Sequence, residues 1–234
     1  MLYLPQGMTR INPKGPEPPF IPKGVIFDMD GLMLDTERPE MELYEEISTK
    51  MGWPTPASML QNTIGVTDED ALAFYKRQYG ADYPFEEIWN AVVKEQEIRV
   101  KKNGILHKKG LVHLLNKLKD LGVPLAVATS ADSKRAQWKL TLAGIVDRFT
   151  VFACGDEVQN GKPAPDIFLL AAKKLGLAGK ECVGFEDSSA GLAGLARAGI
   201  PSVFIKDLTE PPPEIRATIW HQCLDLEEAA LLFG

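Results

Sequence analysis

Strand-like apolar runs alternate with helical patterns over most of this chain, and that alternation restricts its fold more than any other feature. The strand-like runs cover residues 25–28, 123–129, 149–153, 182–187 and 202–205. A helical pattern precedes each of the last four runs, at residues 111–121, 133–143, 165–175 and 190–198. Strands that alternate with helices are typical of a parallel sheet with helices on both faces. The sequence therefore predicts an α/β fold.

One long interval departs from this alternation. Between the first two runs the pattern is helical, at residues 41–51, 67–79 and 85–102, with no strand-like segment. An interval of about 70 residues is far longer than a single crossover helix requires. We therefore expect an all-α domain at residues 38–107, inserted into a core domain formed by residues 23–37 and 108–234. The first 22 residues hold several prolines, which predict an irregular arm.

Composition excludes several classes of protein. The 234-residue chain has a net charge of -6, which argues against nucleic acid as its main partner. It has no apolar run of membrane-spanning length and no secretory signal pattern at its start, so we expect no membrane partner and a cytoplasmic location. The three cysteines (Cys154, Cys182 and Cys223) are odd in number and widely spaced, which favours reduced, buried thiols.

Two aspartates follow the first strand-like run in the segment Asp28-Met29-Asp30-Gly31. Ligands collect at the carboxyl ends of parallel strands, and residues two apart on a strand point the same way. Two carboxylates held close either repel, which raises one pKa, or share a cation. Taken alone, the segment is equally consistent with a turn that carries solvated acids.

Polar clusters follow three other strand-like runs as well. They are Thr129-Ser130, Gly161-Lys162-Pro163 and Glu186-Asp187-Ser188. Each has an ordinary explanation by itself, because hydroxyls and carboxylates cap helices and a lysine in a turn is usually solvated. Lys162 is not a Walker lysine, since the glycine spacing is wrong and proline follows it. Their joint order at four strand ends predicts one site that gathers carboxylates, hydroxyls and a lysine, an inventory that suits phosphoryl transfer.

The order of these motifs resembles the haloacid dehalogenase-like hydrolase superfamily. The matching elements are Asp-x-Asp-Gly-x-x-x-Asp-Thr from Asp28, then strand-Thr, Gly-Lys-Pro and Glu-Asp-Ser, and they span nearly all of residues 24–206. The helical insertion after the first motif is similar to that of the β-phosphoglucomutase-like phosphatases. The resemblance implies a Rossmann-like core with strand order 3-2-1-4-5 and a mobile helical cap.

The resemblance also implies catalytic roles. Asp28 would be the nucleophile that forms an aspartyl-phosphate, and Asp30 the general acid and then the general base. Thr129, with Ser130 beside it, and Lys162 would hold the transferring phosphoryl oxygens. To serve as an acid near neutral pH, Asp30 would need a raised pKa.

A metal site follows from the same resemblance. Asp28, Asp187 and the main-chain carbonyl of Asp30 would bind Mg²⁺, with Glu186 binding it directly or supporting its ligands. The ion would offset the negative charge of the phosphoryl group. Three scattered histidines and the lack of a Cys-x-x-Cys pair argue against zinc.

Several reactions occur in this superfamily. Dehalogenation is disfavoured by the acid at Asp30, and phosphonate cleavage by the lack of a suitable cap lysine. Sugar phosphomutases of this type carry a histidine where this chain has Glu40 and a basic residue where it has Asp68. An aspartate there would repel a second phosphate, so hydrolysis is favoured. Gly65 and Asp68 would face the non-reacting part of the substrate.

Together these features predict a Mg²⁺-dependent hydrolase of small-molecule phosphate esters, with a phosphorylated sugar or related metabolite as substrate. We expect a monomer or a weak homodimer. A sugar phosphomutase is the main alternative. A binding module without activity is the other, and the intact Asp28, Asp30, Thr129, Lys162 and Asp187 argue against it.

Overall fold

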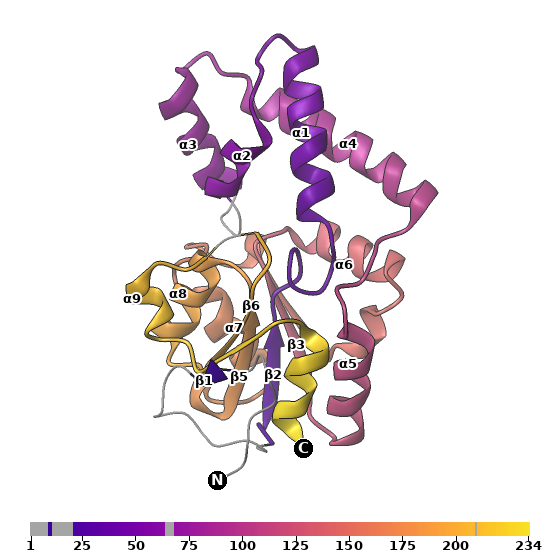
Figure 1. Ribbon diagram of the computed structural model, residues 1–234, viewed down its shortest axis with the longest axis vertical. Coiled ribbons are helices and arrows are strands. Elements are labelled where there is room, and N and C mark those ends of the chain that lie inside the picture. The colour runs from indigo at the N-terminus through magenta and orange to yellow at the C-terminus, as the bar shows by residue number, and fades with distance from the viewer. Residues whose placement is uncertain (1–8, 11–20, 64–67, 209) are drawn as a thin grey trace.

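The computed structural model describes residues 9–10, 21–63, 68–208 and 210–234 of the chain. Figure 1 shows a sheet flanked by helices in the lower half of the molecule and a separate group of helices above it. The chain passes into the upper group soon after its first long strand and returns before the second. The predicted α/β fold with an inserted all-α segment is confirmed.

The described strands form one sheet in the order β1-β7-β6-β5-β2-β3-β4. They are β1 (Thr9–Arg10), β2 (Gly24–Phe27), β3 (Leu125–Thr129), β4 (Val151–Cys154), β5 (Cys182–Glu186), β6 (Ser202–Ile205) and β7 (His221–Cys223). All neighbouring pairs from β7 to β4 are parallel, and β1 pairs antiparallel with β7. The five predicted strands therefore stand in the predicted order 3-2-1-4-5.

Two strands of the sheet have no counterpart in the sequence prediction. β7 is only three residues long and carries His221 and Gln222, so it lacks the apolar run of a buried strand. β1 lies in the arm that we expected to be irregular, and its two residues pair with Gln222 and His221. Both strands form because the open edge of the sheet offers hydrogen-bonding groups to a neighbouring segment.

Helices cover both faces of the sheet, as predicted. They are α5 (Leu111–Asp120), α6 (Ser133–Leu142), α7 (Asp166–Lys174), α8 (Ser189–Ala198), α9 (Pro213–Arg216) and α10 (Leu226–Ala229), with short 3₁₀ turns at Val146–Arg148, Gly155–Glu157, Gly179–Glu181 and Ala230–Phe233. Side chains of α5, α6 and α10 pack with Phe27 and Val127 on one face of the sheet. Side chains of α7 and α8 pack with Ile26 and Ala126 on the other. The inner strands are thus buried on both sides, which explains their continuous apolar runs.

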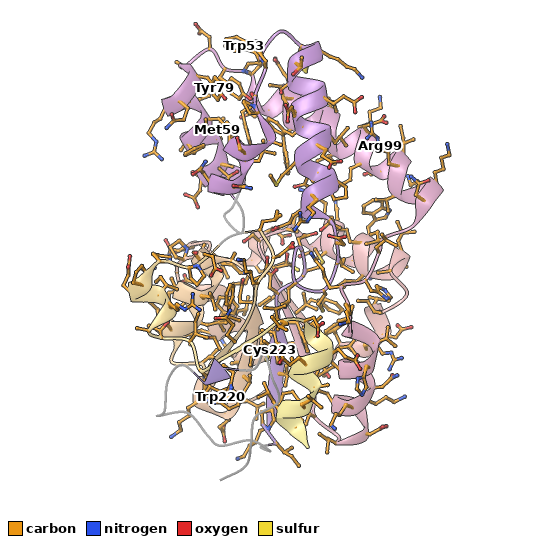
Figure 2. All side chains as sticks on the ribbon, in the orientation of Figure 1. Trp53, Met59, Tyr79, Arg99, Trp220 and Cys223 are labelled. Atoms are coloured by element: carbon orange, nitrogen blue, oxygen red, sulfur yellow. The ribbon has the colours of Figure 1, made fainter. Side chains whose placement is uncertain are left out.

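The inserted helices have a core of their own. They are α1 (Glu37–Lys50), α2 (Ala57–Leu60), α3 (Asp68–Tyr79) and α4 (Phe85–Asn103), with a 3₁₀ turn at Gln61–Thr63. Tyr75 stacks on Tyr83 and Phe85, with ring centroids 5.6 and 5.2 Å apart. Figure 2 shows the labelled Trp53, Met59 and Tyr79 within this upper group, and all three border its apolar cluster. Aromatic packing thus holds these four helices together.

Two chain segments connect the inserted helices to the sheet, and they pair with each other. The backbone N–H of Asp35 donates to Leu106 O at 2.9 Å, and that of Lys108 donates to Met33 O at 2.9 Å. Gly31 begins this connection with a φ of 80°, a left-handed conformation that favours glycine and permits the sharp turn expected there. The boundaries predicted for the arm, the core and the helical domain stay predictions.

Two expectations from composition concern these residues. Cys154, Cys182 and Cys223 are free and buried, as predicted. None of the helices in the described ranges combines the length and the apolar character needed to cross a membrane.

Candidate active site

The predicted polar clusters meet at the carboxyl edge of the sheet, the edge that faces the inserted helices (Figure 1). Asp28 follows β2, Thr129 ends β3, Lys162 lies between β4 and α7, and Glu186 and Asp187 lie at the end of β5. Parallel strands end at the same edge, so residues distant in sequence become neighbours there.

Lys162 lies at the centre of this cluster and is almost completely buried. Its Nζ atom donates to Asp28 Oδ1 and, at 2.6 Å, to Glu186 Oε1. Burial disfavours the charged ammonium, but the two carboxylates outweigh it and raise the pKa of Lys162 above its usual value. Lys162 is therefore an ammonium ion held between two acids. The alternative of a solvated turn lysine is excluded.

Glu186 is fixed by hydrogen bonds on both of its oxygens. Oε1 accepts from Lys162, while Oε2 accepts from the backbone N–H groups of Asp187 and Ser188 at 2.8 and 2.7 Å. Ser188, not Glu186, caps α8, through a bond from the N–H of Gly191 to its Oγ. A side chain on Gly191 would overlap Oε1 of Glu186, so only glycine leaves room for this carboxylate.

Asp28, Glu186 and Asp187 each offer an oxygen within 4.8 Å of the others. Burial raises the pKa of Asp28 to about 7; Lys162 opposes this shift, and Glu186 adds to it. Burial, together with Glu37, Glu186 and Asp28, also raises the pKa of Asp187 well above its usual range. Asp187 Oδ1 is buried and has no hydrogen-bond partner among the described residues. Clustered, underbonded carboxylate oxygens of this kind suit a hard cation.

Two further acids join this cluster that the sequence analysis missed. Glu37, Asp187 and Asp207 also bring their oxygens within 4.8 Å of one another. Burial and the charges of Asp28 and Asp30 raise the pKa of Glu37 well above its usual value. Asp207 follows β6, so a polar residue after the fifth strand was the available signal. Glu37 offered only its place directly after the Asp-Thr pair of the first motif.

The carboxylate of Asp30 points to a different set of partners. Its Oδ1 accepts hydrogen bonds from Thr36 Oγ1 and, at 2.7 Å, from Lys139 Nζ. Burial alone would raise the pKa of Asp30, but Lys139, Thr36 and Arg135 together lower it. This direction is opposite to the one that a general acid requires. The Asp30 side chain also lies outside the carboxylate groups that could hold a metal, so only its main-chain carbonyl remains as the predicted ligand.

Lys139 is another functional candidate that sequence reasoning missed, after Glu37 and Asp207. It is only 2% exposed and comes from α6, on the helix face that also carries the buried Ala136 and Leu140. A lysine three residues after one apolar position and beside another interrupts the core face of a helix. That irregularity was the signal in the sequence.

Thr129 and Ser130 line the cavity beneath the inserted helices. Thr129 is buried, and its Oγ1 accepts from the N–H of Ala131 at 3.2 Å. Asp132 caps α6, because its side chain accepts from the N–H groups of Lys134 and Arg135. Thr129 and Ser130 are therefore not the cap of this helix, and the ordinary explanation for them is excluded.

A cavity of about 130 Å³ separates the sheet edge from the inserted helices. Its floor includes Asp28, Asp30, Thr129 and Ser130, and its walls include Glu40, Met41, Tyr44, Leu60, Thr63, Tyr75, Phe85, Trp89, Arg135 and Lys139. Arg135 lies over the ring of Trp89 at 5.2 Å and 3.8 Å from Glu40. The cavity thus has a charged floor and walls that combine aromatic side chains with a few polar groups.

Two cap residues are predicted to contact substrate, and the structure describes only the backbone of one of them. Gly65 lies outside the described residues. Asp68 begins α3, but its side chain lies outside the description. Their predicted role stays a prediction, while Glu40 is placed in the cavity wall.

The family model of the haloacid dehalogenase-like hydrolases matches residues 22–199. The chain is a member of this family. A Thermotoga maritima protein named phosphorylated carbohydrates phosphatase is 30% identical over 182 residues, which cover 78% of this chain and 84% of that protein. Hexitol phosphatase A of Escherichia coli is 33% identical over 184 residues, covering 74% and 79%.

The fold is shared with solved structures of this family. The crystal structure of CbbY from Rhodobacter sphaeroides in complex with phosphate has a TM-score of 0.75 and 24% sequence identity, and the match covers 90% of this chain and 99% of that one. At this identity the likeness concerns the fold. The family of this hydrolase includes a phosphatase of phosphorylated carbohydrates.

Proposed function

We propose that this hydrolase cleaves phosphate monoesters in a Mg²⁺-dependent reaction that passes through an aspartyl-phosphate on Asp28. The observation that carries the proposal is the pairing of Asp28 with the buried ammonium of Lys162 at the floor of a cavity that also contains Asp30. A carboxylate next to a fixed cation can approach an anionic phosphoryl group with less repulsion.

The reaction has two steps. In the first, an oxygen of Asp28 forms a bond to phosphorus, the bond from phosphorus to the ester oxygen breaks, and Asp30 gives a proton to the leaving alcohol. In the second, water attacks the aspartyl-phosphate, Asp30 takes a proton from that water, and Asp28 and inorganic phosphate are released.

Asp30 must carry a proton for the first step, although its surroundings lower its pKa. A bound phosphate brings negative charge close to this carboxylate, and a like charge favours the protonated form. We propose that Asp30 gains its proton as the substrate binds. The positive charges of Lys139 and Arg135 then favour its return to the carboxylate that activates water.

Three residues would hold the transferring phosphoryl oxygens. Lys162 offers its ammonium, while Thr129 and Ser130 lie beside Asp28 and Asp30 in the cavity floor. Hydrogen-bond donors fixed before the substrate arrives stabilise the charge that develops in the transition state without having to reorganise.

The acidic cluster fits Mg²⁺. Asp187 Oδ1 lacks a hydrogen-bond partner in the described part of the chain, and oxygens of Asp28 and Glu186 lie within 4.8 Å of its carboxylate oxygen. We propose Asp28 and Asp187 as side-chain ligands, with Glu186 in a supporting role because hydrogen bonds already occupy both of its oxygens. When bound, Mg²⁺ would neutralise charge on the phosphoryl oxygens.

The substrate class that we propose is a small phosphorylated sugar or a related metabolite. A cavity of about 130 Å³ limits the size of the leaving group in this state. Glu40 and Thr63 in its walls offer hydrogen-bonding groups for hydroxyls. The names of two relatives, a phosphorylated carbohydrates phosphatase and a hexitol phosphatase, support the same class.

The proposal also covers cellular location, oligomeric state and the motion of the inserted helices. Buried free thiols support a reducing cytoplasm as the site of action. We propose a monomer or a weak homodimer in which residues 38–107 act as a cap that closes over the substrate. Closure would exclude bulk water from the aspartyl-phosphate.

The test is phosphate release from a panel of phosphate monoesters, with Mg²⁺ or with a chelator, for the natural chain and for Asp28→Asn. We expect metal-dependent release that Asp28→Asn abolishes. Asp120→Asn, an exposed carboxylate on α5, is the matched control and should behave as the natural chain. If no ester releases phosphate, an isomerase assay with a sugar bisphosphate primer tests the phosphomutase alternative, and failure of both assays favours the binding module.

A further inference from the structure

Lys139 is a buried cation that enters the two-step reaction proposed above only through its charge, which leaves open what its direct contact with Asp30 does. Its side chain is 3% exposed, and its Nζ atom lies 2.7 Å from Asp30 Oδ1. A buried ammonium is costly unless it is paired, so this contact fixes the side chain of Lys139 as well as that of Asp30.

Thr36 binds the same oxygen of Asp30. Thr36 stands at the N-cap position of α1, yet its side chain makes no capping hydrogen bond. Its hydroxyl donates instead to Asp30 Oδ1. Two donors from separate elements, α6 of the core and the start of α1, therefore converge on one oxygen atom.

The two aspartates of the first motif thus have separate lysines. Lys162 binds Asp28 and Glu186, whereas the described ion pair of Lys139 is with Asp30. The Lys139 pair also differs from an enclosed structural ion pair, because both residues line the cavity and the Asp30 side chain is 26% exposed.

We propose that Lys139 is a positioning residue that acts through Asp30. Together with Thr36 it holds Oδ1, which leaves Oδ2 as the oxygen that exchanges a proton with the ester oxygen and then with water. The inference rests on the proposed function, in which Asp30 transfers protons. Lys139 itself makes no contact with the phosphoryl group.

The test compares Lys139→Met with the natural chain on two substrates. With a sugar phosphate from the panel, whose alcohol must be protonated as it leaves, we expect kcat to fall about 10- to 100-fold, part of what an acid–base group contributes, with KM nearly unchanged. With p-nitrophenyl phosphate the leaving group needs no proton, so the initial burst of nitrophenol should keep its rate. Lys134→Met, at an exposed position of the same helix, is the matched control.

A double-mutant cycle separates positioning from direct action on the substrate. In an Asp30→Asn background, Lys139→Met should lower kcat on the sugar phosphate by less than about 3-fold, because a residue that acts through Asp30 loses its role there. Two results would overturn the proposal. One is an equal loss of kcat in both backgrounds, and the other is a burst of nitrophenol that Lys139→Met slows as much as the steady-state rate.

Lys139→Arg keeps the positive charge and serves as a second variant in case Lys139→Met does not fold. It should restore part of the kcat on the sugar phosphate, and full activity of Lys139→Met on both substrates would also overturn the proposal. A natural chain that releases no phosphate from any ester refutes the proposed function instead, so the two failures are distinguishable.

Discussion

Lys162 Nζ lies 2.6 Å from Glu186 Oε1, and both side chains are buried beneath the helices that cover the sheet. The same ammonium binds Asp28, so one lysine offsets two buried acids. This arrangement makes the core of the site depend on a charge supplied from the segment between β4 and α7.

Lys162→Met should therefore weaken both the fold and the reaction. Loss of one partner from a buried ion pair typically costs about 3–5 kcal/mol of the free energy of unfolding, because the remaining charge has no counterion. Loss of a donor to the phosphoryl oxygens should lower kcat about 10²-fold or more. Urea unfolding and phosphate release measure the two effects. Lys174→Met removes a partly exposed ion pair with Glu157 and should cost less than about 1 kcal/mol.

Metal binding should depend on pH, because the acids of the cluster hold protons in the metal-free fold. The raised pKa values of Asp28 and Asp187 mean that these groups contribute stability below their unfolded values and lose it as the pH rises through their folded values. The metal-free protein should therefore melt at a lower temperature at about pH 8 than at about pH 6. Mg²⁺ should raise Tm more at the higher pH, where it replaces those protons.

Asp187→Asn gives the complementary result. It removes a buried carboxyl group whose charged form destabilises the fold, so at alkaline pH the metal-free variant should be more stable than the natural chain by about 1–2 kcal/mol, while it loses activity and the response of Tm to Mg²⁺. Calorimetry with and without the metal checks this. A variant that is still stabilised by Mg²⁺ as strongly as the natural chain would contradict the proposed ligand set.

Gly191→Ala should disturb the site without touching a charged group. The added methyl group would overlap Glu186 Oε1, so either the helix or the carboxylate must move. Overpacking of this kind typically costs about 1–3 kcal/mol. Because Glu186 supports Lys162 and Asp28, we expect the apparent affinity for Mg²⁺ and the value of kcat to fall together. Unchanged activity would show that Glu186 tolerates displacement.

Glu40→Gln should change substrate choice more than chemistry. Glu40 lines the cavity and accepts a hydrogen bond from Gln96 Nε2 at 2.9 Å, so its oxygen is held in place. The neutral amide keeps the size of the side chain but changes its charge and its donors. We expect kcat/KM ratios among sugar phosphates to change by about 10-fold, with little effect on p-nitrophenyl phosphate. An unaltered ranking of substrates would contradict a role for Glu40 in recognition.

The polar clusters at the strand ends could be predicted from local sequence patterns. Asp28, Thr129, Lys162, Glu186 and Asp187 were each predicted from an apolar run followed by polar residues. The structure brings them to one edge because parallel strands share their direction. The weaker elements escaped prediction for a related reason: β7 is short and polar, and its pairing with the neighbouring strands β6 and β1 makes it a strand.

The surroundings of Asp30 could not be predicted in the same way. Lys139 lies 109 positions from Asp30, on a helix whose pattern suggested only packing. Its contact depends on how α6 lies against the connection to the inserted helices. The lowered pKa of Asp30 follows from that contact. A general-acid role would need a raised pKa, and the sequence does not show that Lys139 lies beside Asp30.

The sequence by itself determined the α/β fold, the inserted helical segment and the strand-end residues that meet at the carboxyl edge of the sheet, because apolar periodicity and strand-end motifs are local properties of the chain. Only the tertiary structure decided which charges meet. It paired Lys139 with Asp30 and joined Glu37 and Asp207 to Asp187. Electrostatic interactions depend on distance and burial in space, and neither quantity is set by separation along the chain.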